Sequence, residues 1–174
     1  MKIAFFSLLG LIMIVSIIFG PRINKDIKKK RAYENTYAIQ NVGTGKDIRV
    51  QDAGNDNGTK IILYSHHNWE CITWQMIRLE DDTYLLKNLY TQKSFQPTSD
   101  PAEGIDLWQQ TMGGTSFQYW EFIKQSDETY LIRLKDTELY LTTTSDEDDS
   151  AIILMPKQDS DSQRWKLIRQ NPIV

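Results

Sequence analysis

Two histidines and one cysteine are the side chains in this chain best suited to bind a metal. His66 and His67 are adjacent, and Cys71, the only cysteine, follows shortly after them. A structural zinc site takes four ligands, usually in two closely spaced pairs. No second pair stands at that spacing, so these residues indicate an ordinary loop and we expect no metal site. A single cysteine also excludes an intrachain disulfide.

The acidic run at 146–149 is the next candidate for chemistry, since carboxylates bind calcium. It lacks the glycine and the terminal glutamate of a calcium-binding loop. We therefore expect a solvated acidic turn. The sequence contains no recognisable nucleophile–base motif, phosphate-binding loop or carboxylate pair. This predicts a non-catalytic protein without a cofactor.

The totals limit the chain to few classes. Its 174 residues suit one domain of ordinary size, and 40% hydrophobic with 25% charged residues is typical of a globular protein. The formal net charge is -3, so the basic surface needed for nucleic acid is absent overall. We expect no nucleic-acid partner.

The first 21 residues form a separate hydrophobic segment. Residues 3–20 are apolar apart from Ser7 and Ser16, and Pro21 ends the run. This length lies between a signal-peptide core and a full membrane span. Two interpretations stay open: a cleaved signal peptide, or an uncleaved single-span anchor through which the protein would contact the membrane.

A basic linker at 22–35 follows. The positive-inside rule would place this flank in the cytoplasm, while Lys2 and the α-amine favour the opposite orientation. We expect a secreted or membrane-anchored protein with its domain outside the cytoplasm, and keep a cytoplasm-facing anchor as the alternative. The basic residues of the linker are Arg22, Lys25, Lys28, Lys29, Lys30 and Arg31.

The rest of the chain is a threefold repeat of 46 residues. Copies one, two and three span 37–82, 83–128 and 129–174. Each opens at a Thr-Tyr pair and closes on a tryptophan followed three residues later by isoleucine. Between them we align three further blocks: Ile61–Tyr64, Ile105–Trp108 and Ile152–Met155. Such a period predicts an array of similar units.

Each copy reads as four short strands. In copy one they are 37–40, 47–51, 60–65 and 73–79, rich in β-branched and aromatic residues and separated by glycine- and asparagine-containing turns. Pro97 weakens the second strand of copy two. Twelve strands in three units can close into a barrel with capping hairpins, which removes exposed sheet edges.

The closing blocks carry a family resemblance. Two QxW motifs occur, Gln118-Tyr119-Trp120 in copy two and Gln163-Arg164-Trp165 in copy three. Copy one has a degenerate version of the motif, Ile72-Thr73-Trp74. At spacings of 46 and 45 residues they resemble the repeats of ricin B-type (QxW) lectins over residues 36 to about 170. The resemblance implies an all-β fold, a β-trefoil, over 36–174. Two departures are the lack of cysteines to pair within each repeat and the missing glutamine in copy one.

The repeated tryptophans are expected to belong to the core. Trp74, Trp120 and Trp165 recur with the strand pattern, and an indole buries a large apolar area. Gln118 and Gln163 also suit a structural role, since their amides can satisfy backbone or side-chain partners at the barrel rim.

The resemblance also implies a shallow sugar pocket in each copy. In the family an acidic residue follows the second strand, an aromatic platform closes the third-strand block, and polar residues near QxW complete the site. A pyranose has a face of C–H groups and a rim of hydroxyls, so it needs a platform together with directional acceptors.

Carried over to copy two, the family pattern places the platform at Trp108 with Asp106 two residues before it. Ser99 or Asp100 fills the acidic position, and Gln118 is retained. We expect this pocket to be the best sugar site.

In copy one, Asp52 matches the acid and Tyr64 the platform, while Asn68 or His67 must replace the polar residues lost at Cys71 and Ile72. In copy three, Thr143 replaces the acid and Met155 the aromatic, so we expect no binding there.

The leading hypothesis is a carbohydrate-binding, lectin-like module whose partner is a glycan or glycoprotein. The alternative is a trefoil that binds proteins, as a toxin-complex or adhesin subunit or as an inhibitor. The degenerate pockets favour this alternative.

Overall fold

A computed structural model describes residues 33–113 and 115–170 of the chain. The hydrophobic segment 1–21 and most of the basic linker lie outside the described residues. Within the described part, no helix is long and apolar enough to cross a membrane.

Twelve strands make up the described part of the chain, four in each copy, as the repeat predicts. They are β1 (Thr36–Asn41), β2 (Asp47–Val50), β3 (Ile61–Tyr64), β4 (Thr73–Arg78), β5 (Tyr84–Asn88), β6 (Ser94–Pro97), β7 (Leu107–Gln110), β8 (Tyr119–Lys124), β9 (Tyr130–Leu134), β10 (Leu139–Thr143), β11 (Ile152–Pro156) and β12 (Trp165–Arg169). Pro97 lies at the end of its strand, where its missing N–H costs least.

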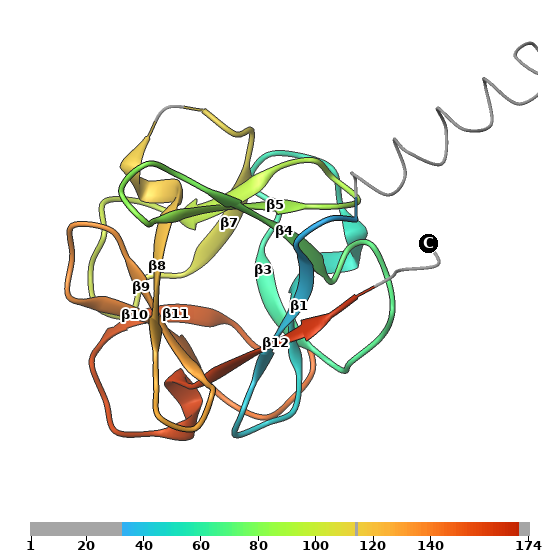
Figure 1. The fold of residues 1–174 in the computed structure, drawn as a ribbon. Coiled ribbons are helices and arrows are strands. Elements are labelled where there is room, and N and C mark those ends of the chain that lie inside the picture. The colour runs from blue at the N-terminus through green and yellow to red at the C-terminus, as the bar shows by residue number, and fades with distance from the viewer. Residues whose placement is uncertain (1–32, 114, 171–174) are drawn as a thin grey trace, which may run out of the picture. The chain divides into compact units, whose positions relative to one another are not determined.

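The strands form a β-trefoil, which confirms the predicted fold class (Figure 1). The first and fourth strands of each copy pair antiparallel in a closed ring, β1-β4-β5-β8-β9-β12, with β12 returning to β1. The second and third strands form three hairpins, β2-β3, β6-β7 and β10-β11, around the threefold axis. Closure leaves the barrel without an unpaired edge.

The core lies where the barrel and the hairpins meet. Trp74, Trp120 and Trp165 are each 0% exposed, as predicted from their spacing. Two of the indoles donate to a backbone carbonyl of the second strand of their own copy: Trp74 Nε1 to Ile48 O at 3.0 Å and Trp165 Nε1 to Leu141 O at 3.1 Å. These bonds satisfy a polar atom that would otherwise be buried at a cost.

The QxW glutamines hold the loop before the barrel strand. Gln118 Nε2 donates to Gln96 Oε1 at 3.0 Å and Thr111 O at 3.1 Å, and its Oε1 accepts from Gly113 N at 3.2 Å. Gln163 makes the equivalent contacts in copy three, to Thr142 Oγ1 at 2.8 Å and Pro156 O at 2.9 Å. Both side chains are buried.

The acidic turn at 146–149 is more engaged than we expected. Asp148 Oδ1 accepts from Ser65 N at 2.8 Å and pairs with Lys46 Nζ at 2.9 Å. The hydrogen bond from Lys46 is the main reason that the pKa of Asp148 is lowered. This turn therefore ties copy three to copy one, while its four acidic residues stay exposed, as expected for a solvated acidic turn.

Candidate functional site

The hairpin registers show that our alignment of the third strands is wrong in copy two. Ile48 pairs with Leu63, Leu141 with Leu154, and their counterpart Phe95 with Gln109. The equivalent of Tyr64 and Met155 is therefore Gln110. Trp108 lies two residues earlier, at the position of Ile62 and Ile153.

The bridges between hairpins give the same correspondence. Lys60 bridges to Trp108, Asp106 to Ile153 and Ala151 to Ile62, so Trp108 takes the threefold position of the two isoleucines. Our sequence alignment placed the third strand of copy two two residues out of register, because the polar Gln109 occupies a core position where the other copies have leucine. Gln109 is 0% exposed, while the apolar pair Ile105 and Leu107 imitates the usual pattern two residues upstream.

The structure links two of the four residues predicted for the copy-two pocket, Trp108 and Gln118, through Gln96. Trp108 is half-buried and pairs across the hairpin with Gln96, whose Oε1 accepts from Gln118. Asp100 and Asp106 are exposed in the loop that joins β6 to β7. The indole Nε1 of Trp108 is buried and has no hydrogen-bond partner among the described residues. The side-chain amide of Gln118 makes its hydrogen bonds to Gln96, Thr111 and Gly113 within the protein.

Copy one has a cluster of rings at its third strand that sequence reasoning only partly found. We call it the Arg49 stack: Arg49, Tyr64, His67 and Trp69. The rings of His67 and Trp69 are stacked, with centroids 4.0 Å apart and planes 7° apart. The Arg49 guanidinium carbon lies 4.1 Å from the centre of the Tyr64 ring and 5.5 Å from that of Trp69.

The missing QxW glutamine explains why this stack exists. In copies two and three the glutamine bonds to Gln96 or Thr142 on the second strand. Copy one has Ile72 in place of the glutamine and Arg49 in place of its partner, as the strand registers show. The Arg49 guanidinium therefore turns to the aromatic rings, and its Nε is buried without a partner in the described part of the chain.

The residues predicted for the copy-one pocket surround this stack. Tyr64 is half-buried at the end of β3, and Asn68 is exposed between His67 and Trp69. Asp52 is exposed in the turn after β2, with a left-handed backbone at φ 51°. Its neighbour Ala53 packs on the same small apolar cluster as Tyr64 and Trp69. Copy one therefore combines aromatic rings with a nearby exposed carboxylate.

A contact between the buried Asp47 and the exposed His66 anchors the loop that carries these rings. Asp47 is 0% exposed, and its Oδ2 lies 2.7 Å from Nδ1 of His66. Burial raises the pKa of Asp47 to about 6, an effect that the charge and hydrogen bond of His66 only partly offset. His66 therefore joins the loop to the start of β2, beside Tyr64, which pairs with Asp47 across the hairpin.

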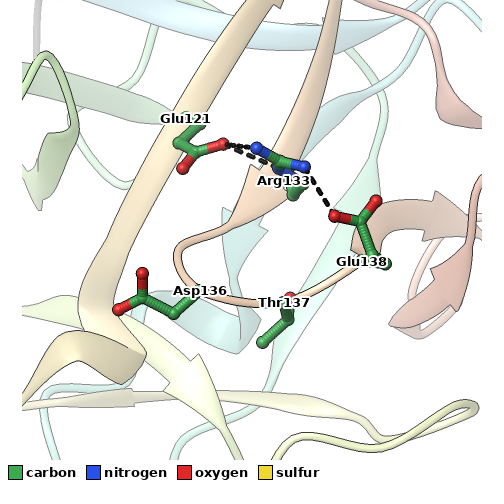
Figure 2. A pocket seen from close by; sticks show the side chains of 5 residues that line it. All are labelled: Glu121, Arg133, Asp136, Thr137 and Glu138. Carbon is green, nitrogen blue, oxygen red and sulfur yellow. Dashed lines mark hydrogen bonds and ion pairs between the residues drawn. The ribbon is translucent and has the colours of Figure 1, made fainter.

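Within its described residues, copy three has neither an acid nor an aromatic ring at the equivalent positions. Thr143 is buried, and its Oγ1 donates to Ser162 O at 3.4 Å. Met155 occupies the platform position and offers no flat ring. A surface hollow between β8 of copy two and the β9–β10 turn of copy three, shown in Figure 2, is lined by Glu121, Arg133, Asp136, Thr137 and Glu138. There Arg133 is paired with both glutamates, at 2.6 Å and 2.9 Å.

The sequence predicted no metal site at the two histidines and Cys71. No group of three or more metal-binding side chains occurs within 33–113 and 115–170. Cys71 is a buried free thiol. His66 Nδ1 lies 2.7 Å from Asp47 Oδ2, and the ring of His67 stacks on Trp69.

The closed ring of six strands and the three hairpins define a ricin-like trefoil. The sequence profile described as the ricin-type beta-trefoil lectin domain matches residues 35–165, so the chain belongs to this family. A comparison with curated proteins finds no match.

Solved structures share the fold at low identity. The designed threefold-symmetric protein ThreeFoil has a TM-score of 0.75 and 22% identity, over 78% of this chain and 99% of its own. The ricin B-like lectin of Macrolepiota procera, solved with lactose, has 0.66 and 19%, over 77% and 94%. The Rhizoctonia solani agglutinin has 0.71 and 18%, over 78% and 95%.

Proposed function

We propose that this chain is a non-catalytic carbohydrate-binding module with its principal site in copy one. The observation that carries the proposal is the ring cluster of Tyr64, His67 and Trp69 beside the exposed carboxylate of Asp52, in a member of a lectin family. Flat rings take the C–H face of a sugar, and a carboxylate accepts hydrogen bonds from its hydroxyls.

Copy one is preferred to copy two on the hairpin register. Copies two and three have Gln110 and Met155 at the position of Tyr64, and neither side chain provides a ring. The pocket predicted from Asp100, Asp106, Trp108 and Gln118 stays a second candidate, because Trp108 is half-buried and Asp106 lies near it in the chain.

Titration of galactose, lactose and N-acetylgalactosamine, followed by tryptophan fluorescence and NMR, tests the proposal. A single shallow site corresponds to a dissociation constant in the millimolar range, about -4 kcal/mol. Trp69→Ala should abolish binding, while the matched variant Trp108→Ala should leave it unchanged. The reverse result would move the site to copy two.

A glycan array at high protein density tests the wider claim. If no glycan binds, the protein-interaction alternative replaces the lectin proposal. That alternative is favoured by the two copies without an aromatic platform. Export or membrane anchoring through residues 1–21 is part of our proposal, and sequencing the mature N-terminus from the native host tests it. Several anchored copies would raise weak binding through avidity.

A further inference from the structure

Arg49 is the side chain at the copy-one site that the structure leaves without an anionic partner. Its guanidinium makes no hydrogen bond or ion pair with any residue in the described part of the chain, and its Nε is buried. Arg78, Arg133 and Arg164 all pair with carboxylates. A guanidinium without an anionic partner can still form charge-assisted hydrogen bonds, so a ligand that supplies acceptors to its terminal N–H groups would be favoured.

The stack fixes the orientation of this guanidinium. Arg49 lies on β2, where its backbone pairs with Ile62, and its guanidinium carbon is 4.1 Å from the Tyr64 ring centre. A guanidinium packed on aromatic rings is already held in one orientation before a ligand binds, so little further conformational entropy is lost on binding. Its planar arrangement of N–H donors is kept. Such a fork matches a carboxylate, with which it forms two parallel charge-assisted hydrogen bonds.

We propose that copy one selects a carboxylate-bearing saccharide, a uronic acid or a sialic acid, through Arg49. This inference rests on the proposed function, since the sugar ring must still stack on the aromatic side chains beside Arg49. The acid would face the guanidinium, and the hydroxyl rim would face the Asp52 turn. Asp52 is exposed, so it can accept from hydroxyls while water screens it from the ligand carboxylate.

Paired ligands that differ only in the acid provide the test. Galactose is compared with galacturonic acid, and lactose with sialyllactose, by NMR titration of the domain at low and high salt. We expect each acidic sugar to bind at least tenfold more tightly than its neutral partner, and the ratio to fall as salt rises. Galactose 6-sulfate separates recognition of a planar carboxylate from simple charge attraction, and should bind more weakly than galacturonic acid.

Arg49→Gln introduces the residue type that copy two has at this position, and should reduce the ratio of acidic to neutral affinity to about one. Arg49→Lys keeps the charge without the fork and should give an intermediate ratio; it also serves if the glutamine variant fails to fold. Arg78→Gln removes the same charge on β4 and should leave the ratio unchanged.

The outcomes separate the two proposals. Equal binding of acidic and neutral sugars, or a preference that survives Arg49→Gln, overturns the inference and leaves the lectin function standing. Stronger binding of the sulfate than of the carboxylate also overturns it. If neither acidic nor neutral sugar binds, the proposed function fails and the inference fails with it.

Discussion

Single residues in this protein show which polar groups a trefoil tolerates inside. Asp47 is fully buried, yet it is balanced by His66 and by Gln40 Nε2, which donates to its Oδ1 at 3.3 Å. Removing a carboxylate from water is expensive unless it is paired. The raised pKa of Asp47 shows that pairing only partly offsets this cost.

The stability of the protein should depend on pH through Asp47. Its pKa of about 6 lies above its usual value, so the folded state binds this proton more tightly than the unfolded state. The resulting stabilisation is complete below about pH 4 and is lost as pH rises through 6. Between pH 4 and 8, the unfolding free energy of wild type should therefore fall by up to about 3 kcal/mol relative to Asp47→Asn.

Urea melts of both proteins at pH 4, 6 and 8 measure this difference. Parallel pH dependences for the two proteins would show that Asp47 does not titrate in this range. His66→Gln is the partner control: it removes the ring that hydrogen-bonds to Asp47 Oδ2, so it should destabilise the protein most where Asp47 is ionised.

The core and surface assignments predict a contrast in stability. Trp120→Ala should cost about 3–5 kcal/mol, because the indole is 0% exposed and packs on Phe95. Asp146→Ala changes an exposed residue and should stay within about 0.5 kcal/mol of wild type. Asp148→Ala should cost about 1 kcal/mol, since it removes the contacts to Ser65 and Lys46. Similar denaturation midpoints for all three variants would contradict these assignments.

At the residue scale the sequence predicted the core better than the site. The three tryptophans were predictable because each recurs at the same strand position. Arg49 and Trp69 were missed, because neither matches a motif: Arg49 acts through a ring on the neighbouring strand, and Trp69 lies in an irregular loop. The available signal was Ile72, which stands where the other copies have the QxW glutamine. The residue that would bond to this glutamine needs another partner, and in copy one that residue is Arg49.

Among the elements, the β6–β7 hairpin departs most from the repeat. Its buried Gln109 replaces the leucine of the other copies and donates through Nε2 to Gly54 O and Asp56 O, both at 2.7 Å. Copy two thereby holds the 54–58 loop of copy one. The hydrophobic pattern could not predict this register, because a polar core residue is stabilised only by a loop from another copy.

Gln109→Leu should therefore destabilise the protein by about 1–2 kcal/mol, although leucine is the residue at both equivalent positions. The variant loses two hydrogen bonds to backbone carbonyls, and the gain in apolar burial offsets only part of this. Amide exchange at Gly58, which donates to Gln109 O at 2.9 Å, should become faster. A more stable variant with unchanged exchange at Gly58 would contradict the role assigned to this side chain.

The whole trefoil depends on contacts between its ends. β1 pairs with β12 over five residues and with β4 over three. Deleting residues 165–174 removes a barrel strand and a core indole, so it should abolish cooperative unfolding, as measured by circular dichroism during a urea titration. A circular permutant that starts at Thr129 and joins Gln170 to Thr36 keeps every strand and should unfold cooperatively. Failure of the permutant would mean that strand order matters beyond pairing.

This pairing of the first strand with the last also decides when folding can finish. The ribosome releases β1 at the start of the domain and β12 only at its end, so β1 can pair early with β4 but must wait for β12 through nearly the whole translation of the domain. Until then the barrel is open and its apolar faces are available to chaperones. A chain in this state can still be threaded through a narrow pore, whereas a closed barrel cannot.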